Sequence, residues 1–147
     1  MCYVDRKREP HSVMVTQREI EIVQADWAKV ELMGDAAATL LYDRVFSLDP
    51  SARALFSADM AKQKGKLVRM IGSAIAGLSN PELLLPIMEY LGRKHDKLGV
   101  QPHQYAIVGA ALLWTLKLAL GAEFGPEHEA AWTNVYAELS HSMRAAS

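Results

Sequence analysis

Leu83-Leu-Leu-Pro-Ile-Met-Glu-Tyr-Leu-Gly-Arg-Lys-His95-Asp-Lys-Leu-Gly-Val100 is a helical pattern whose apolar stripe contains a histidine. The residues of the stripe follow helical spacing and are Leu84, Met88, Leu91, His95 and Leu98. His95 is the only one of the five histidines in such a position. Because an unpaired buried imidazole costs about 1–3 kcal/mol, His95 needs a partner. The residues alone leave two alternatives: a hydrogen bond to a backbone carbonyl in a packed core, or coordination of iron or zinc.

The composition predicts one compact domain in the cytoplasm. A chain of 147 residues can bury roughly two-thirds of its unfolded surface. Its 16 basic and 17 acidic side chains nearly balance, which argues against nucleic acid as a partner. The single cysteine, Cys2, cannot form an internal disulfide and is typical of a reducing cytosol.

Two segments bear on targeting and membranes. Residues 1–15 include Asp5-Arg-Lys-Arg-Glu9 and lack an apolar core, so we expect a frayed polar tail and not a secretory signal. A single domain is then expected over residues 16–147. The apolar run from Ala106 to Ala122 contains Lys117 and falls short of a bilayer span, so we expect a helix buried on most sides and no membrane partner.

Helix start signals recur along the chain. Thr16-Gln-Arg-Glu19 is a capping box, in which Glu19 reaches back to the cap amide. Pro86 lies inside a helical segment and should divide it into a short turn and the helix of His95. No alternating strand pattern appears, so the sequence predicts an all-α domain of about seven helices. Four prolines occupy a first helical position, where a missing N–H does no harm: Pro50, Pro81, Pro102 and Pro126.

The sequence predicts structural or solvent-exposed positions for the tryptophans and for two of the other histidines. Trp27 and Trp132 occupy core positions of the helical pattern, whereas Trp114 is a candidate contact to a second subunit. His103 and His128 lie near helix starts and are expected to be solvated.

Three kinds of metal centre can be compared at His95. A zinc site needs three or four ligands, and no second histidine or cysteine stands at ligand spacing from His95. Covalent haem attachment uses a C-x-x-C-H motif, which the sequence lacks. One histidine among many apolar helical residues fits a noncovalent haem, whose porphyrin supplies four further ligands.

Spaced motifs between Thr16 and Ala146 resemble the globin family. They are Leu41-Tyr-Asp-Arg-Val-Phe46, Asp49-Pro50 with Leu55-Phe56, Leu91-Gly-Arg-Lys-His95, Tyr105-Ala-Ile-Val-Gly109 with Leu112-Leu113, and Ala130-Ala-Trp132 with Tyr136. The sequence is similar to bacterial single-domain haemoglobins, to the globin domain of flavohaemoglobins and to neuroglobin. The resemblance implies the globin fold, a three-over-three helical sandwich that encloses a b-type haem.

The resemblance also implies which residues hold the haem. His95 would be the proximal iron ligand, and its other ring N–H would be donated to the carbonyl of Leu91, one turn back. Phe56 would stack on the haem face. Further cofactor contacts would be Leu91, Val100 and Tyr105, with Lys66 and Arg93 either as contacts of the haem propionates or as solvated surface charges.

On the opposite face of the haem, the resemblance implies that Tyr42 and Gln63 stabilise the ligand. Leu67, one turn after Gln63, would crowd the gas. The residues alone favour another interpretation, in which Tyr42 is a core aromatic with a satisfied hydroxyl and Gln63 is a surface amide on a helix. Over iron, the O–H of Tyr42 and the NH₂ of Gln63 can donate hydrogen bonds to dioxygen, which gains negative charge there. We therefore expect slow oxygen release.

Two departures from flavohaemoglobins bear on the expected activity. This sequence contains no reductase domain, so we expect any sustained turnover to need an external reductase. In that family a glutamate of the last helix joins the proximal histidine and a tyrosine. Tyr105 matches the tyrosine, but the glutamate position falls near Ser147 and Glu138 comes too early to replace it.

Three functions from different classes follow. The favoured one is reversible binding of dioxygen, for storage, transport or buffering, with nitric oxide and carbon monoxide as further ligands. The second is nitric oxide detoxification, in which a dioxygenase converts nitric oxide to nitrate with electrons from an external reductase. The third is a gas or redox sensor module. The protein is expected to be a monomer or a homodimer.

Overall fold

Eight helical segments make up most of residues 15–56 and 59–146, which the computed structural model describes. No strand occurs among these residues, as the sequence predicts. The expected tail lies outside the described residues except for Val15. The segments are α1 (Gln17–Glu31), α2 (Asp35–Leu48), η2 (Pro50–Leu55), α3 (Met60–Gly77), α4 (Pro81–Leu98), α5 (Pro102–Leu120), η3 (Gly121–Glu123) and α6 (Pro126–Ala145).

The predicted start signals do begin helices. At α1 the Glu19 amide donates to Thr16 Oγ1 at 3.1 Å and the Thr16 amide donates to Glu19 Oε1 at 3.0 Å, which completes the capping box. Asp59 caps α3, where its carboxylate accepts from the Lys62 amide at 3.2 Å. The four predicted prolines each begin a helix, because a first-turn residue needs no N–H partner inside the helix.

The predicted break at Pro86 is wrong. One continuous helix runs from Pro81 to Leu98 with Pro86 inside it. The ring of Pro86 removes only the hydrogen bond to the carbonyl of Glu82, one turn earlier. Both residues are exposed, so water can satisfy that carbonyl. The helix of His95 is therefore longer than expected and begins at Pro81.

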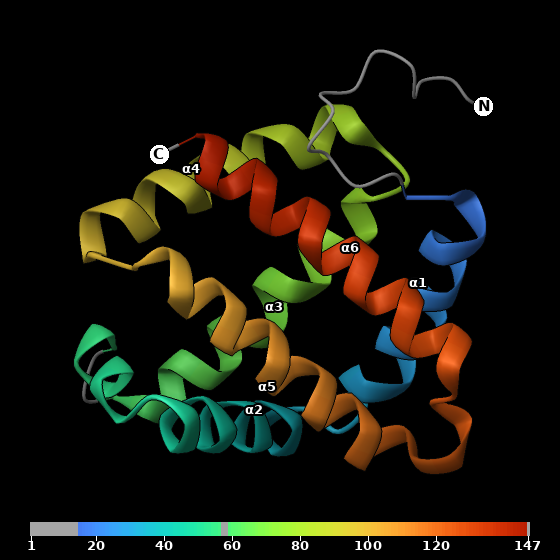
Figure 1. The fold of residues 1–147 in the computed structure, drawn as a ribbon, viewed down its shortest axis with the longest axis horizontal. Coiled ribbons are helices and arrows are strands. Elements are labelled where there is room, and N and C mark those ends of the chain that lie inside the picture. Colours follow the sequence, from blue (N-terminus) through green and yellow to red (C-terminus); the bar gives the residue numbers. More distant parts are fainter. Residues whose placement is uncertain (1–14, 57–58, 147) are drawn as a thin grey trace.

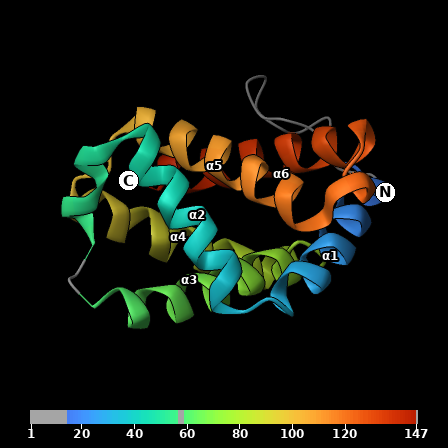
Figure 2. The same ribbon diagram turned by 90° about the horizontal axis from the view of Figure 1, so that it is seen from below.

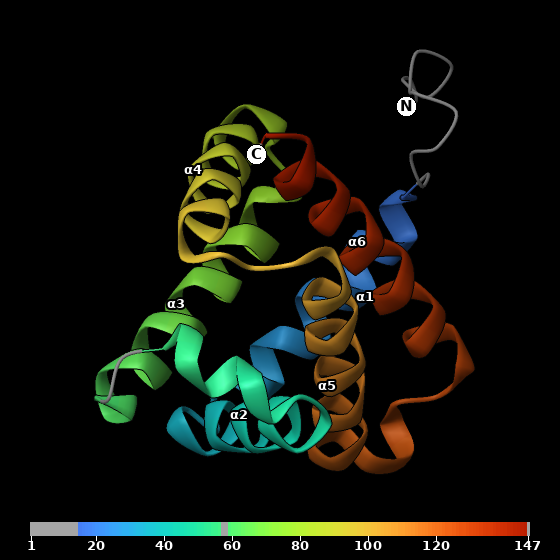
Figure 3. The same ribbon diagram turned by 60° about the vertical axis from the view of Figure 1, so that its left-hand side comes forward.

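The helices form two layers, as the resemblance implies (Figures 1 and 2). In the view from below, α5 and α6 lie in one layer and α3 in the other (Figure 2). Between the layers, α1 and α4 pack on α6, and α2 packs on α3. Within the layers, α2 packs on α5 and α3 on α4. Figure 3 shows α4 and α3 beside each other and the end of α6 reaching α4.

Two clusters of buried side chains hold these layers together. The larger joins α1, α2, α5 and α6 around fully buried residues such as Val23, Leu116 and Val135. The smaller consists of Ala74, Met88, Tyr105 and Met143 and lies beside the His95 stripe. The stripe itself is less buried than predicted: Met88 is buried, but Leu98 is 49% exposed, because it lies in the last turn of α4.

The apolar helix α5 also differs from expectation. By length and composition residues 102–123 could cross a membrane, with a mean hydropathy of 1.6, but a buried core helix passes the same test. Only 28% of that apolar window is buried. Tyr105, Leu112 and Leu116 face the core, whereas Leu118 is 55% exposed. The helix is therefore buried on one side and not on most sides.

Candidate haem site

His95 contacts a phenol and not the predicted backbone carbonyl. Its Nδ1 atom lies 3.2 Å from the hydroxyl oxygen of Tyr105. The two rings meet edge to face, with centroids 5.7 Å apart. The prediction that Leu91 supplies the acceptor is therefore wrong. When Nδ1–H donates to the phenol oxygen, Nε2 keeps its lone pair, which is the tautomer that a metal ligand needs.

A tight turn between α4 and α5 brings these two residues together. Gly99 ends α4 in the left-handed conformation, with φ of 84°. The amide of Val100 then donates to the carbonyl of His95 at 2.9 Å, which closes the last turn of the helix. Because α5 starts at Pro102, its first turn lies beside the last turn of α4. Tyr105 thus reaches the imidazole from a neighbouring helix.

Burial sets the protonation of both partners. It lowers the pKa of His95, with a smaller contribution from the nearby Lys94 ammonium. It raises the pKa of Tyr105, although the Arg144 guanidinium acts in the opposite direction. At neutral pH the pair is therefore a neutral imidazole beside a neutral phenol. A neutral imidazole is the form that coordinates metals.

The second cluster of the site surrounds Tyr42 in α2. Its ring is buried and packs between Phe46, at a centroid distance of 5.8 Å, and Phe56, at 5.1 Å. Its hydroxyl donates to the backbone carbonyl of Gln63 at 3.5 Å, which is a long and weak hydrogen bond. Burial raises the pKa of Tyr42 to about 12, so its hydroxyl stays protonated and can donate. The structure thus brings the Tyr42 hydroxyl to the main chain of Gln63, and the role of the two side chains toward a gas ligand stays a prediction.

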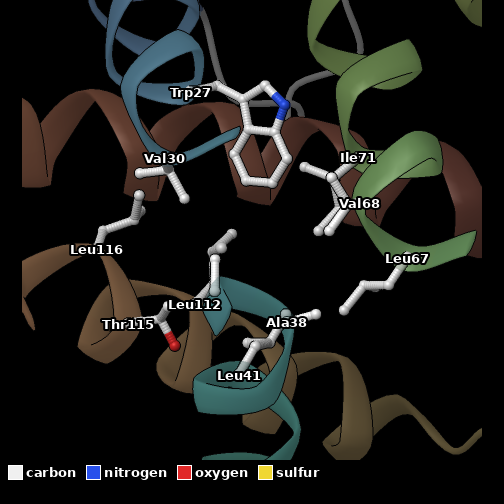
Figure 4. Close-up of a pocket in the computed structure, with 11 residues that line it drawn as sticks. Trp27, Val30, Ala38, Leu41, Leu67, Val68, Ile71, Leu112, Thr115 and Leu116 are labelled. Carbon is white, nitrogen blue, oxygen red and sulfur yellow. The ribbon is translucent and has the colours of Figure 1, made fainter. Parts of the chain in front are cut away.

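Leu67 lies one turn after Gln63 and joins this side of the site to the main core. It is half-buried and lines a small apolar void of about 10 Å³. Figure 4 shows Leu67 and Val68 from α3 facing Ala38 and Leu41 from α2, with Trp27 above them. A void of this size and apolar lining stays dry or holds about one small molecule.

The side chains present fit a haem better than a bare metal ion. Among the described residues, no group of three histidine, cysteine or acidic side chains gathers to hold an ion. The chain offers one neutral imidazole with a phenol at its Nδ1 atom, together with half-buried apolar side chains at Phe56, Leu67 and Leu91. A single protein ligand suffices for a haem because the porphyrin supplies four nitrogens.

Comparison with known proteins identifies the family. A family model described as Globin matches residues 39–143, which is more than half of the chain. The chain belongs to the globin family. Membership implies a haem cofactor and the binding of gaseous ligands. This globin therefore has a fold of two helical layers, with His95 in its candidate haem site.

The globin is similar to two kinds of curated protein. It is 32% identical to the flavohemoprotein of Rhizobium meliloti (strain 1021) over 86% of this chain and 32% of that protein. With the flavohemoprotein of Bacillus subtilis (strain 168) it shares 28% identity over 88% of this chain and 33% of that protein. The chain thus spans about a third of the length of these relatives. With the neuroglobin of Tetraodon nigroviridis it shares 27% identity over 88% of this chain and 90% of that protein.

The other predicted contacts of this globin fall into two groups. Leu91 and Val100 are half-buried and pack on the small cluster that contains Tyr105, so they lie close to His95. Lys66 and Arg93 are exposed, and their contact with a haem propionate stays a prediction. In Figure 1 the end of α4, the start of α5 and η2 all lie toward the left of the globin, where the site is.

One polar cluster escaped the sequence analysis. His128 is not simply solvated as predicted: its Nδ1 lies 2.7 Å from the carboxylate of Asp26, which is only 1% exposed. Trp132 donates to the same carboxylate oxygen at 3.0 Å. His128 and Trp132 are four residues apart and share a helix face. That spacing, with an acidic residue beside the core position Trp27, was the signal that could have revealed the cluster.

Proposed function

We propose that this globin binds dioxygen reversibly at a b-type haem held by His95. When bound, the haem supplies the iron at which a diatomic gas binds. The chain supplies a neutral imidazole on one side and the Tyr42 hydroxyl on the other. The observation that carries the proposal is the Tyr42–Gln63 contact, because it places a protonated, buried donor at the first turns of α3.

The role of Tyr42 follows from the single hydrogen of its hydroxyl group. A phenol has one O–H to donate, and in this structure Gln63 accepts it through the backbone carbonyl. A gas ligand that carries negative charge competes for the same hydrogen. Since the contact with the carbonyl is 3.5 Å long, little is lost when the hydroxyl turns away from it. Tyr42 therefore discriminates in favour of polar ligands such as dioxygen over carbon monoxide.

The role of His95 follows from its partner. The Tyr105 hydroxyl fixes the ring orientation and favours the tautomer with a proton on Nδ1. Burial keeps the imidazole neutral. His95 is thus held ready to coordinate iron through Nε2, and no proton has to be removed first.

Absorption spectra of the purified full chain test the proposal. The protein is loaded with haem and recorded in ferric, deoxy and carbon monoxide forms, and then exposed to air after reduction. We expect stoichiometric haem binding, and an oxygenated spectrum that returns to the deoxy form when oxygen is removed. A protein that takes up no haem, or that oxidises at once without an oxygenated form, would contradict the proposal.

Nitric oxide dioxygenation is the second candidate, favoured by similarity to proteins whose name joins flavin and haem. Sustained turnover of this kind consumes electrons, which a reductase would supply. Nitrate formation with excess nitric oxide and a generic reductase distinguishes the two. A single stoichiometric burst supports an oxygen-binding protein, whereas steady nitrate production supports the enzyme.

A further inference from the structure

A solvent-open groove lies between the start of α5 and the end of α6. It encloses about 260 Å³ and is lined by the rings of Tyr105 and Tyr136, by Ala106 and Ala137, and by the polar residues Ser140 and Arg144. The α5 side of the lining is Pro102, Tyr105 and Ala106, and α6 supplies Ser140 and Arg144. Of the predicted haem contacts, only Tyr105 also lines this groove.

Of the residues that line the groove, Arg144 alone carries a charge. Arg144 lies over the ring of Tyr105 at 5.9 Å, and its Nε donates to the Ser140 hydroxyl at 3.3 Å. Among residues 15–56 and 59–146, none of the ion pairs includes Arg144. A guanidinium has five N–H donors, so most remain available to a ligand.

The hydroxyls that line the groove are already engaged. Tyr136 donates to the backbone carbonyl of Tyr105 at 2.6 Å, and Tyr105 contacts His95 through its own hydroxyl. Arg144 is therefore the donor that a ligand meets, and the tyrosine rings act as flat walls. Guanidinium forks match carboxylates in a bidentate geometry.

We infer that this groove binds a small organic anion, in which one carboxylate is attached to a flat apolar body. The carboxylate pairs with Arg144, and the body lies between Tyr136 and the alanines. The volume is below the usual range of about 300–1,000 Å³ for drug-sized ligands, which restricts the ligand to about the size of one aromatic ring.

The ligand also contacts the partner of the proposed iron ligand. Tyr105 forms a wall of the groove with its ring and holds His95 with its hydroxyl. An anion that draws Arg144 away from the Tyr105 ring changes the surroundings of this phenol. The groove is thus an effector site for gas binding. This second part rests on the proposed function, and by linkage the gas must alter anion affinity equally.

Titration with benzoate tests the groove without any use of haem. Sodium benzoate is added to the full chain, and binding is followed by calorimetry and by proton NMR of the tyrosine rings. We expect saturable binding of one benzoate. Neutral benzamide should not compete. Arg144→Gln should weaken binding roughly tenfold or more, because a charged hydrogen bond is lost.

Three variants control this experiment. Arg69→Gln removes an exposed arginine from α3 and should leave binding unchanged. Arg144→Lys keeps the charge without the fork and should give intermediate affinity. Ala106→Leu leaves Arg144 in place and fills the groove at an exposed position, so it should abolish binding. Absence of saturable binding, or equal affinity in wild type and Arg144→Gln, would overturn the assignment.

Gas release tests the link to His95. In the haem-loaded protein, saturating benzoate should change the rate of oxygen release in wild type and leave it unchanged in Arg144→Gln. Saturable binding without a change in rate would refute the effector role. A chain that binds benzoate but takes up no haem would refute the proposed function while the groove assignment stands.

Discussion

Gly92 in α4 packs directly against the main-chain carbonyl of Met143 in α6. A Cβ atom at Gly92 would overlap that carbonyl oxygen, and the side chain of Ala146 lies 3.2 Å from the same point. Gly92 is buried and precedes His95 by three residues, so both lie near the same face of α4. The position of the imidazole is therefore set in part by the close approach of α4 to α6.

Gly92→Ala should destabilise the globin and weaken its hold on haem. The added methyl group meets rigid backbone, and overpacking of this kind costs about 1–3 kcal/mol. Denaturant unfolding followed by circular dichroism measures the first effect, and haem transfer to apomyoglobin measures the second. Gly65→Ala is the control, because a Cβ there meets the flexible side chain of Arg69. Equal stability of the two variants would show that α4 and α6 can separate freely.

His128→Ala should destabilise the protein because it removes one of two donors from a buried carboxylate. Asp26 would keep only the indole of Trp132. Leaving a buried acceptor short of a partner costs about 1–3 kcal/mol. Urea unfolding at neutral pH measures the loss. His103→Ala, an exposed histidine in the first turn of α5, should change the free energy of unfolding by about 0.5 kcal/mol or less. If His128→Ala lowers the free energy of unfolding no more than His103→Ala does, water has replaced the imidazole as the partner of Asp26.

Tyr42 should make the fold sensitive to alkaline pH. Burial raises its pKa to about 12, whereas an unfolded tyrosine ionises near pH 10, at about its ordinary pKa. The stabilisation is thus complete below about pH 10 and is lost as the pH rises toward 12. It amounts to about 2–3 kcal/mol. In Tyr42→Phe the unfolding free energy should fall less steeply across that window. Parallel curves for both proteins would place the Tyr42 hydroxyl in contact with water.

His95→Ala should remove or greatly weaken haem retention in a protein that still folds into helices. His95 is half-buried and supplies the single imidazole of the site. The Soret band after gel filtration and far-UV circular dichroism test these two points. Tyr105→Phe, which keeps the ring and the imidazole, should retain haem. A normal deoxy spectrum in His95→Ala would end the assignment of this residue as the iron ligand.

Tyr42→Phe should release oxygen faster because one hydroxyl donor is lost. A hydrogen bond worth about 1–3 kcal/mol corresponds to roughly 5- to 150-fold. We expect the lower part of this range, since the hydroxyl has a competing acceptor at Gln63. Gln63→Leu should act in the same direction and less than additively. Stopped-flow release of oxygen and carbon monoxide provides the comparison. Unchanged oxygen release in both variants would remove this pair from function.

Local signals predicted where helices begin, and long-range contacts limited the rest. The Thr16 capping box and the helix-starting prolines depend only on neighbouring residues, and the structure confirms them. The predicted helix break at Pro86 was wrong because the effect of this proline depends on whether water reaches the carbonyl of Glu82. That exposure is decided by which side of α4 faces solvent, which a single helix pattern does not determine.

In the candidate site, too, local patterns and the resemblance predicted some features, whereas contacts between helices decided the others. The helical spacing found His95, and the resemblance found Tyr42 and Gln63. The resemblance also matched Tyr105 to a tyrosine beside the proximal histidine, and the structure confirms that contact. The Leu91 acceptor was wrong because the turn at Gly99 brings the first turn of α5 to the imidazole. His128 was misassigned for the same reason, since its partner Asp26 lies 102 residues earlier in the chain. Pairing between helices requires the packed fold.

The short turn at Gly99 has a consequence for the order of folding. His95 and Tyr105 are only 10 residues apart, whereas Tyr42 and Gln63 are 21 apart and lie in helices separated by η2. Closing a shorter loop loses less chain entropy. We therefore expect the imidazole–phenol pair to form early and to persist when α2 and α3 have come apart. A folding globin chain would then have its proximal imidazole held in place before its gas pocket is complete.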